Sequence, residues 1–136
     1  MNSSDLEGEG GLVVAIVEDD PAYRRSLGRL CRVLGFTVVE FASGAEFLEA
    51  LDGTAPRVDC LLVDKMMPRM TGLELHAILV DRGQYLPTVI ITGDADPRTR
   101  ARCHAAGVAA CLEKPIEADT LFAMLVQAAG RSIVTS

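Results

Sequence analysis

Short apolar runs alternate with amphipathic segments along most of the chain. The apolar runs lack a regular polar face, which is typical of strands buried on both sides of a sheet. We expect five of them to be strands, at residues 12–17, 37–41, 58–64, 87–91 and 108–112. Helical segments follow each of them, at about residues 20–34, 43–51, 71–79, 98–105 and 117–129, of which the segment at 98–105 is more polar than the others. The alternation predicts an α/β fold with parallel strands, right-handed crossovers and five helices on both faces of the sheet.

Capping residues mark where several of these helices begin and end. Asp20 precedes Pro21, which pairs an N-cap acid with a proline at the first helical position. Ser43 and Thr71 are each followed three residues later by a glutamate, the spacing of a capping box. Gly35 ends the first helix. The N-cap role is sufficient to explain Asp20, so we do not expect it to bind a metal.

Length and composition indicate one globular domain. The chain has 136 residues, and 49% of them are hydrophobic, which argues against disorder. We divide it into a flexible leader (1–11), one domain (12–130) and a C-terminal tail (131–136). The polar leader lacks the features of a signal peptide, and no apolar run approaches the roughly 18 residues of a membrane span. We therefore expect a cytoplasmic protein with no membrane partner.

Charge and cysteine spacing argue against two further classes of function. The formal net charge of −6 argues against direct binding of nucleic acid by this domain. The four cysteines contain no C-x-x-C pair, so we expect free, mostly buried thiols and no zinc site. The arginines are dispersed and predict solvated helix faces, at positions 24, 25, 29, 32, 98, 100 and 102.

Polar side chains follow four of the predicted strands. Glu18 and Asp19 come after the first strand, Asp64 ends the third, Thr92 follows the fourth and Lys114 follows the fifth. The carboxyl ends of parallel strands lie at one edge of a sheet, where open α/β sheets bind their ligands. We therefore expect three carboxylates, a hydroxyl and an ammonium to converge there. Clustered carboxylates repel one another unless a cation joins them, and hard oxygen ligands suit Mg²⁺.

Four sequence stretches resemble the receiver domain of two-component response regulators. They are residues 17–21, 63–72, 90–93 and 113–115, and the resemblance extends over about residues 12–130. Each motif is short, but the four in this order, each after its strand, are specific to that family. The resemblance implies a doubly wound five-stranded sheet in the flavodoxin-like order 2-1-3-4-5.

The resemblance also implies a role for each residue at the sheet edge. Asp64 takes a phosphoryl group from a phosphohistidine, and Thr92 and Lys114 bind that group. The metal ligands are Glu18, Asp19, Asp64 and the backbone carbonyl of Met66, with Mg²⁺ as the cofactor and Mn²⁺ as a possible substitute. The Lys114–Pro115 peptide bond is expected to be cis. For Thr92 the alternative is a strand-end hydroxyl that caps the next turn.

The implied partners are proteins. A sensor histidine kinase or a phosphotransfer protein donates the phosphoryl group, and the output acts on a downstream protein or on a C-terminal effector domain. A phosphorylation-dependent homodimer is a further expectation of the resemblance. The domain is then a switch, not an enzyme that turns over a metabolite, although it catalyses its own phosphorylation and slow dephosphorylation.

Two residues depart from the family pattern. Cys111 stands where an aromatic residue is usual, and we expect its small side chain to leave a pocket between strand five and the fourth helix. Lys65 follows the phosphoacceptor where an apolar residue is usual, and we expect its ammonium to reach solvent and to favour the phosphorylated state. His76 and His104 are expected in surface or packing roles.

Two other functions compete with the phosphoacceptor switch. A docking module that works without phosphorylation would need none of the site residues, yet Asp64, Thr92 and Lys114 are all present. A Mg²⁺-dependent phosphatase of the haloacid dehalogenase type also uses an aspartate nucleophile after a strand. That family has a second acid two residues later, where this chain has Met66.

Overall fold

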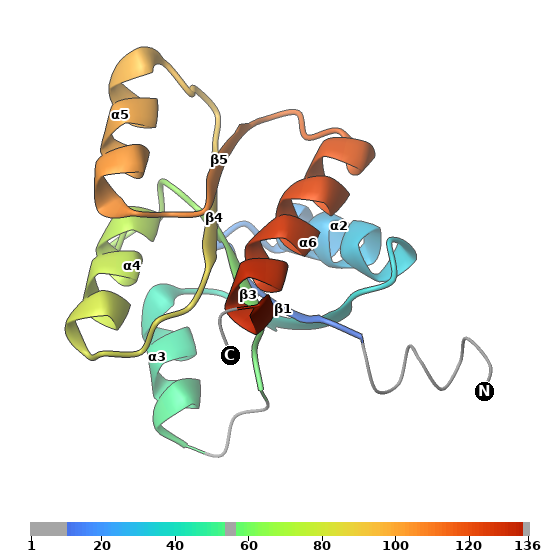
Figure 1. Ribbon diagram of the computed structural model, residues 1–136, viewed down its shortest axis with the longest axis horizontal. Helices are drawn as coiled ribbons and strands as arrows, with labels where there is room; N and C mark the ends of the chain where they lie inside the picture. Colours follow the sequence, from blue (N-terminus) through green and yellow to red (C-terminus); the bar gives the residue numbers. More distant parts are fainter. Residues whose placement is uncertain (1–10, 54–56, 135–136) are drawn as a thin grey trace.

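The computed structural model describes residues 11–53 and 57–134 of the chain. The predicted leader lies outside the described residues except for Gly11. The strands are β1 (Val13–Val17), β2 (Thr37–Phe41), β3 (Cys60–Asp64), β4 (Thr88–Thr92) and β5 (Ala110–Glu113). The helices are α2 (Pro21–Val33), α3 (Gly44–Asp52), α4 (Gly72–Asp81), α5 (Pro97–Ala106) and α6 (Ala118–Val134). Strands and helices alternate as the apolar pattern predicts (Figure 1).

The five strands form one parallel sheet in the order β2-β1-β3-β4-β5. This is the flavodoxin-like order that the sequence resemblance implied, and it is confirmed. The chain places β2 on one side of β1 and places β3, β4 and β5 on the other side. The direction of winding therefore reverses between β1 and β3, which lie side by side. In open α/β sheets, ligands bind beyond the carboxyl ends of the strands at such a switch point.

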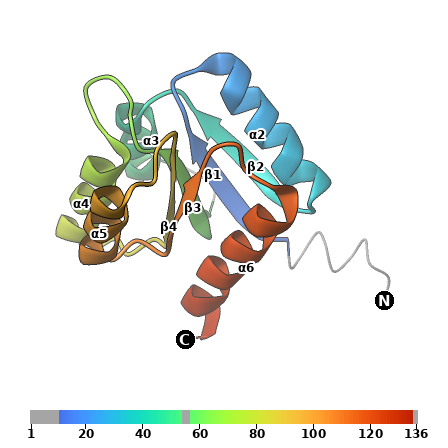
Figure 2. The same ribbon diagram turned by 90° about the horizontal axis from the view of Figure 1, so that it is seen from above.

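Helices cover both faces of the sheet, and each face has its own core (Figure 2). On one face, α2 and α6 pack against side chains such as Ile16, Leu62 and Ile91. On the other face, α3, α4 and α5 pack against the alternate residues of the same strands, such as Val17 and Val63. Burial on both faces explains why the strand sequences are continuously apolar.

Most predicted helix starts are confirmed by their caps. The Asp20 side chain accepts hydrogen bonds from the backbone amides of Ala22 and Tyr23, and Pro21 opens α2. The Thr71–Glu74 capping box is complete. At Ser43 the hydroxyl caps α3, but the glutamate accepts from the amide of Ala42 and not from that of Ser43.

Several predicted boundaries differ from the structure. The third strand begins at Cys60 and not at Val58. Asp59 lies outside the strand, and its side-chain carboxylate accepts a hydrogen bond from the Val13 amide. The fifth strand begins at Ala110, because the amide of Val108 is bonded to the Cys103 carbonyl at the end of α5. Helix α6 continues to Val134, so it includes residues 131–134 of the predicted tail. In the described part of the chain, no helix is long and apolar enough to cross a membrane.

Candidate functional site

Backbone pairing continues past the strand ends and brings the predicted site residues to one edge of the sheet. The amide of Lys65 bonds to the Ile91 carbonyl at 2.7 Å, and the amide of Lys114 bonds to the Thr92 carbonyl at 2.9 Å. The amide of Glu18 bonds to the Phe41 carbonyl at 3.1 Å. The segments that follow β1, β3 and β5 are therefore fixed in register with their neighbours.

Asp64 lies at the centre of this edge and is held on both carboxylate oxygens. Its Oδ1 accepts the backbone amide of Met66 at 3.0 Å, and its Oδ2 accepts the ammonium of Lys114 at 3.0 Å. Burial alone would raise the pKa of Asp64, but contacts with Glu18, the Met66 amide and Lys114 outweigh it and hold the pKa below its usual value. Asp64 is therefore an ionised, buried carboxylate with fixed orientation.

Lys114 joins Asp64 to the first helix. Its ammonium lies 4.4 Å from the centre of the Tyr23 ring, which is the range of a cation–π interaction. Burial disfavours the ammonium, but the hydrogen bond to Asp64 and the nearby carboxylates outweigh this effect and raise the pKa of Lys114. The bond between Lys114 and Pro115 is cis, as the resemblance implied. Tyr23 was not among the site residues predicted from the sequence.

Glu18 is the other buried acid of the site, with 2% of its surface exposed. Its Oε2 accepts the Asp20 amide at 2.9 Å. Its Oε1 is a buried side-chain oxygen that has no hydrogen-bond partner within the described residues. Burial and the neighbouring Asp64 carboxyl raise the pKa of Glu18 to about 8. Two carboxylates cannot donate to one another, so Oε1 stays unpaired until the pair takes up a proton or a cation.

The remaining predicted metal ligands lie around this pair. Asp19 is exposed and lines a cavity of about 350 Å³ between the β2–α3 and β3–α4 segments. The side chain of Met66 is exposed, so only its backbone can contribute to the site. Among the described residues, no three Asp, Glu, His or Cys side chains are grouped closely enough to hold a metal ion. The structure therefore pairs Glu18 with Asp64 but does not close the three-carboxylate cluster that we expected.

The donor set nevertheless fits a hard divalent cation. A buried, unpaired carboxylate oxygen on Glu18 lies beside an ionised Asp64, and both are oxygen ligands of the kind that Mg²⁺ prefers. Mg²⁺ usually keeps several waters and takes only a few ligands from the protein. A closed cluster of three carboxylates is not required for such a site.

Thr92 is buried at the end of β4, but its hydroxyl points into the following turn. It donates to the Asp94 carbonyl at 3.2 Å and accepts the Asp94 amide at 3.1 Å. This is the turn-capping arrangement that we weighed as the alternative for Thr92. In this state the hydroxyl makes no hydrogen bond to Asp64 or Lys114.

Lys65 does not extend into solvent as we expected. Its ammonium donates to the hydroxyl of Thr99 at 3.0 Å, in the first turn of α5. The Thr99 amide is bonded to Asp96, which caps that helix. The side chain of Lys65 thus connects the segment after Asp64 to the helix after Thr92. No sequence signal identifies this pairing, because it depends on how α5 packs against the β3–α4 segment.

The other expectations have mixed outcomes. All four cysteines are free thiols, and three of them are buried. A cavity of about 190 Å³ lies between α5 and β5 and is lined by Cys111, which confirms the expected pocket. His76 is buried and bonds to Thr88 and to the Ala106 carbonyl, a packing role. The prediction that the arginines lie on solvated helix faces is partly wrong, because the Arg24 guanidinium donates a hydrogen bond to the Glu18 carbonyl at 2.8 Å.

Comparison with known proteins identifies the family. The family model of the response regulator receiver domain matches residues 14–126, which is most of the chain. This chain belongs to the response regulator receiver family. The receiver family is the one that the four sequence stretches resembled, so that prediction is confirmed. The domain is a receiver of two-component signal transduction.

Curated and solved receivers give the same assignment. Nodulation protein W of Bradyrhizobium diazoefficiens is 34% identical over 93% of this chain and 58% of that protein. The transcriptional regulatory protein FixJ of Azorhizobium caulinodans is 34% identical over 89% of this chain and 56% of that protein. The crystal structure of FixJ-N has a TM-score of 0.76 and 32% identity over 88% of this chain and 94% of that chain. The chain therefore spans little more than half the length of these curated relatives.

Proposed function

We propose that Asp64 accepts a phosphoryl group from a phosphohistidine and that the phosphorylated receiver changes its binding to a downstream partner. One observation carries this proposal. The Asp64 carboxylate ends β3 with Oδ1 on the Met66 amide and Oδ2 on the Lys114 ammonium, beside the unpaired oxygen of Glu18. Membership of the receiver family supports the same reaction.

The environment of Asp64 suits a nucleophile. Its lowered pKa keeps it ionised at neutral pH, and a carboxylate oxygen can attack phosphorus directly. The new O–P bond forms as the N–P bond to the donor imidazole breaks. Lys114 already lies at Asp64 and can move with the transferring phosphoryl oxygens to offset their charge.

Glu18, Asp19, Asp64 and the Met66 carbonyl are the residues that would hold Mg²⁺, or Mn²⁺ in its place. The buried oxygen of Glu18 supports this assignment, because a cation would give it a partner. A bound divalent ion supplies charge neutralisation for the phosphoryl oxygens. Glu18 then serves to fix the cation's position, and its own pKa would fall toward the ordinary value.

The switch that we propose involves Thr92. A phosphoryl group on Asp64 adds roughly −1.5 to −2 charge by analogy with other phosphorylated side chains. The Thr92 hydroxyl would exchange its bond to the Asp94 carbonyl for a phosphoryl oxygen. Because Asp94 precedes α5 and Thr99 of α5 is tied to Lys65, the change would reach that helix.

The donor in this proposal is a sensor histidine kinase or a phosphotransfer protein. A mostly apolar groove of about 450 Å³ leads to Lys114, which gives a donor protein a surface next to Asp64. Its lining residues are Tyr23, Ser26, Leu27, Leu30, Lys114, Pro115 and Ile116. The output is a separate protein or an attached effector domain, with a phosphorylation-dependent homodimer as one form of signalling. These steps would take place in the cytoplasm.

Intact mass spectrometry tests the proposal. We expect the full chain with Mg²⁺ and acetyl phosphate to gain one phosphoryl group that is stable in acid and labile in base. Asp64→Asn and omission of Mg²⁺ should each abolish the gain. No mass change with any small phosphodonor would favour the docking module. Steady release of phosphate from many monoesters would favour the phosphatase.

A further inference from the structure

The four cysteines form two pairs on opposite faces of the sheet. Cys31 and Cys60 are fully buried in the core beneath α2 and α6. Cys103 of α5 and Cys111 of β5 lie on the other face. Cys103 is 2% exposed, whereas Cys111 is partly exposed. Only the second pair therefore has a member that a small molecule in solution can reach.

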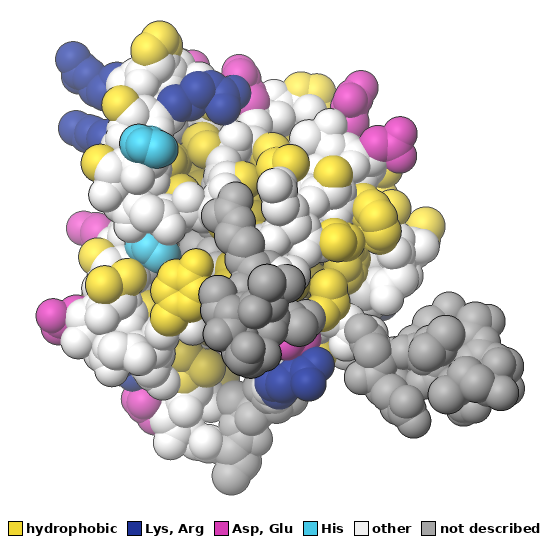
Figure 3. Space-filling model, in the orientation of Figure 1, with side chains coloured by type: hydrophobic (Ala, Val, Ile, Leu, Met, Phe, Trp, Pro, Cys, Tyr) yellow, Lys and Arg dark blue, Asp and Glu magenta, His cyan; other side chains and the backbone are white. Residues whose placement is uncertain are grey.

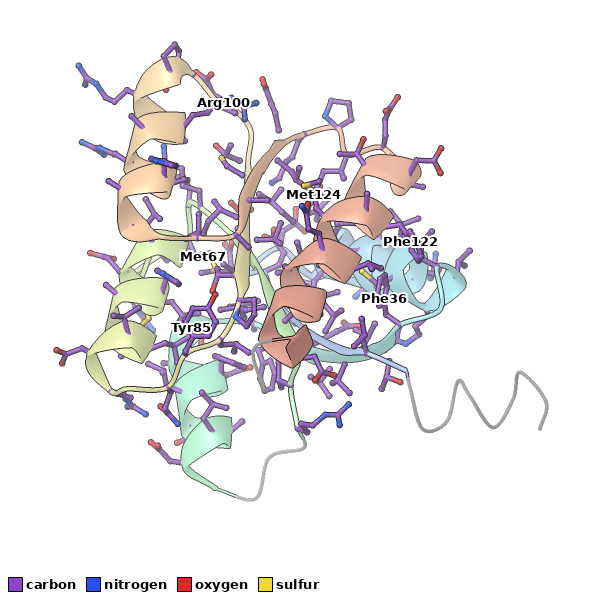
Figure 4. The ribbon with its side chains drawn as sticks, viewed as in Figure 1. Phe36, Met67, Tyr85, Arg100, Phe122 and Met124 are labelled. Atoms are coloured by element: carbon purple, nitrogen blue, oxygen red, sulfur yellow. The ribbon has the colours of Figure 1, made fainter. Side chains whose placement is uncertain are left out.

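Cys103 and Cys111 lie close together on facing elements. Both side chains line the cavity of about 190 Å³ between α5 and β5, and the Cys111 thiol contributes to the raised pKa of Cys103. Arg100 lies between the same two elements (Figure 4) and donates to the carbonyl of Cys111 at 3.4 Å. Basic side chains gather over α5 on this side of the molecule (Figure 3), so the cavity lies beside positive charge.

We propose that Cys103 and Cys111 form a peroxide-sensitive dithiol that closes to a disulfide between α5 and β5. The Cys111 sulfur attacks one peroxide oxygen, the O–O bond breaks, and a sulfenic acid forms with release of water. The Cys103 sulfur then attacks the Cys111 sulfur, the S–O bond breaks, and a second water leaves. In total two thiols and one hydrogen peroxide give one disulfide and two waters.

The surroundings of the two sulfurs assign their order of reaction. Burial and the Cys111 thiol raise the pKa of Cys103 to about 11, although the charges of Lys65 and Arg100 act in the opposite direction. Cys103 is therefore a thiol at neutral pH and is shielded from the peroxide. Cys111 is exposed to the cavity and reacts first, and Cys103 resolves the sulfenic acid.

The disulfide would fasten α5 to the edge strand of the sheet. Residues 93–96 join Thr92 to α5, so a fixed α5 would oppose movement of that segment. This consequence, unlike the disulfide itself, rests on the proposed phosphorylation switch. Oxidation would then limit the output of the receiver without changing any residue that contacts the phosphoryl group.

The test uses the reduced full chain, hydrogen peroxide and no phosphodonor. After alkylation of the remaining thiols, peptide mapping should find a Cys103–Cys111 disulfide, with Cys31 and Cys60 both alkylated once the protein is unfolded. Cys103→Ser should leave a Cys111 sulfenic acid that dimedone traps. Cys111→Ser should leave Cys103 as a thiol at the same dose.

Matched variants separate this proposal from the phosphorylation proposal. Cys31→Ala and Asp64→Asn should form the disulfide at the rate of the unchanged protein. The proposal is overturned if Cys103 and Cys111 both remain alkylatable after peroxide, or if Cys111 proceeds to sulfinic acid without a cross-link. Both of these outcomes are measured on the unchanged protein, so the test does not depend on whether a variant folds.

Discussion

The two buried acids of the site differ in how their oxygens are satisfied. Asp64 has a donor on each oxygen, whereas Glu18 has one oxygen without a partner. The pKa of Asp64 is lowered and that of Glu18 is raised to about 8. Neighbouring acids with pKa values moved apart have different chemical roles. This difference supports the roles in the proposed function, with Asp64 as the nucleophile and Glu18 as a cation ligand.

Replacing Glu18 by glutamine should stabilise the metal-free protein at high pH. An acid whose pKa is higher in the folded state, about 8 against an ordinary 4.5, lowers the free energy of unfolding as pH rises between those values. Glutamine cannot ionise and lacks this loss. We expect Glu18→Gln to raise the thermal midpoint by several degrees at pH 9 and by less at pH 6, measured with a chelator present.

The matched control is Asp19→Asn, one residue away on an exposed side chain. It removes the same formal charge but relieves no buried carboxylate. We expect no gain in midpoint that grows with pH for this variant. Equal gains for Glu18→Gln at pH 6 and pH 9 would show that the carboxylate of Glu18 is not the source of the instability.

At the residue scale, the sequence predicts which polar groups lie at the sheet edge but not how their side chains are paired. Asp64, Glu18 and Lys114 were identified because their positions follow from the strand ends alone. The bond of Thr92 to Asp94 and that of Lys65 to Thr99 depend on side-chain rotamers and loop paths. These two side-chain bonds depend on how distant segments pack together, and the residues next to Thr92 and Lys65 in the sequence do not predict that packing.

At the scale of elements, one hydrogen bond connects the segment after β3 to α5. Lys65 donates to the Thr99 hydroxyl, and Thr99 is 4% exposed. A double-mutant cycle with Lys65→Leu and Thr99→Val measures this connection. We expect a coupling free energy of about 1 kcal/mol from urea unfolding, since a hydrogen bond to a charged donor is worth roughly 1.5–3 kcal/mol and Lys65 is partly exposed to solvent.

The same variants test how Lys65 affects signalling. If the bond transmits a change at Asp64 to α5, Lys65→Leu should alter the phosphorylation rate or the phosphoryl lifetime, and Thr99→Val should alter them in the same direction. Additive stability changes together with unchanged phosphorylation in both variants would remove the role assigned to this bond.

Gly72 sets how closely α4 approaches the end of β3. A Cβ at this position would lie 2.6 Å from the backbone oxygen of Asp64. A backbone atom cannot move aside as easily as the end of a flexible side chain. We therefore expect Gly72→Ala to lower the free energy of unfolding by about 1–3 kcal/mol. Gly130→Ala is the control, because a Cβ at Gly130 meets nothing within 4 Å. Urea unfolding that shows no difference between the two variants would contradict this close approach.

Most of the ten elements could be predicted from periodicity, because the central strands are apolar on both faces and most helices have an apolar stripe. Helix α5 lacks such a stripe, since its only buried residues are Thr99 and Cys103. The ends of the elements were less predictable. Asp59 leaves the third strand to bind the Val13 amide, and Val108 is bonded to the end of α5. The first is a long-range hydrogen bond and the second is a local one at a helix end, and both compete with local strand preference.

At the scale of the whole molecule, two cores on opposite sides of one sheet support a site at its edge. The strands carry alternate residues to each core, so the edge positions of Glu18, Asp64 and Lys114 depend on the register of the entire sheet. A ligand that joins residues from several strands should therefore stabilise the whole domain.

Mg²⁺ should raise the thermal midpoint of the full chain. A ligand that binds only the folded state adds free energy of unfolding in proportion to the logarithm of its concentration, about 2.7 kcal/mol at one hundred times its dissociation constant. We expect Mn²⁺ to act similarly and Glu18→Gln to weaken both effects. A midpoint that does not respond to either ion in the unchanged protein would argue against the assigned cation site.

The most direct test of the central claim is the position of the phosphoryl group. The chain is phosphorylated with acetyl phosphate and Mg²⁺, reduced with borohydride and digested, which converts an aspartyl phosphate to homoserine. The account predicts homoserine at position 64 and at no other acid of the chain. Homoserine at another aspartate, such as Asp19 or Asp94, or none at position 64, would contradict it.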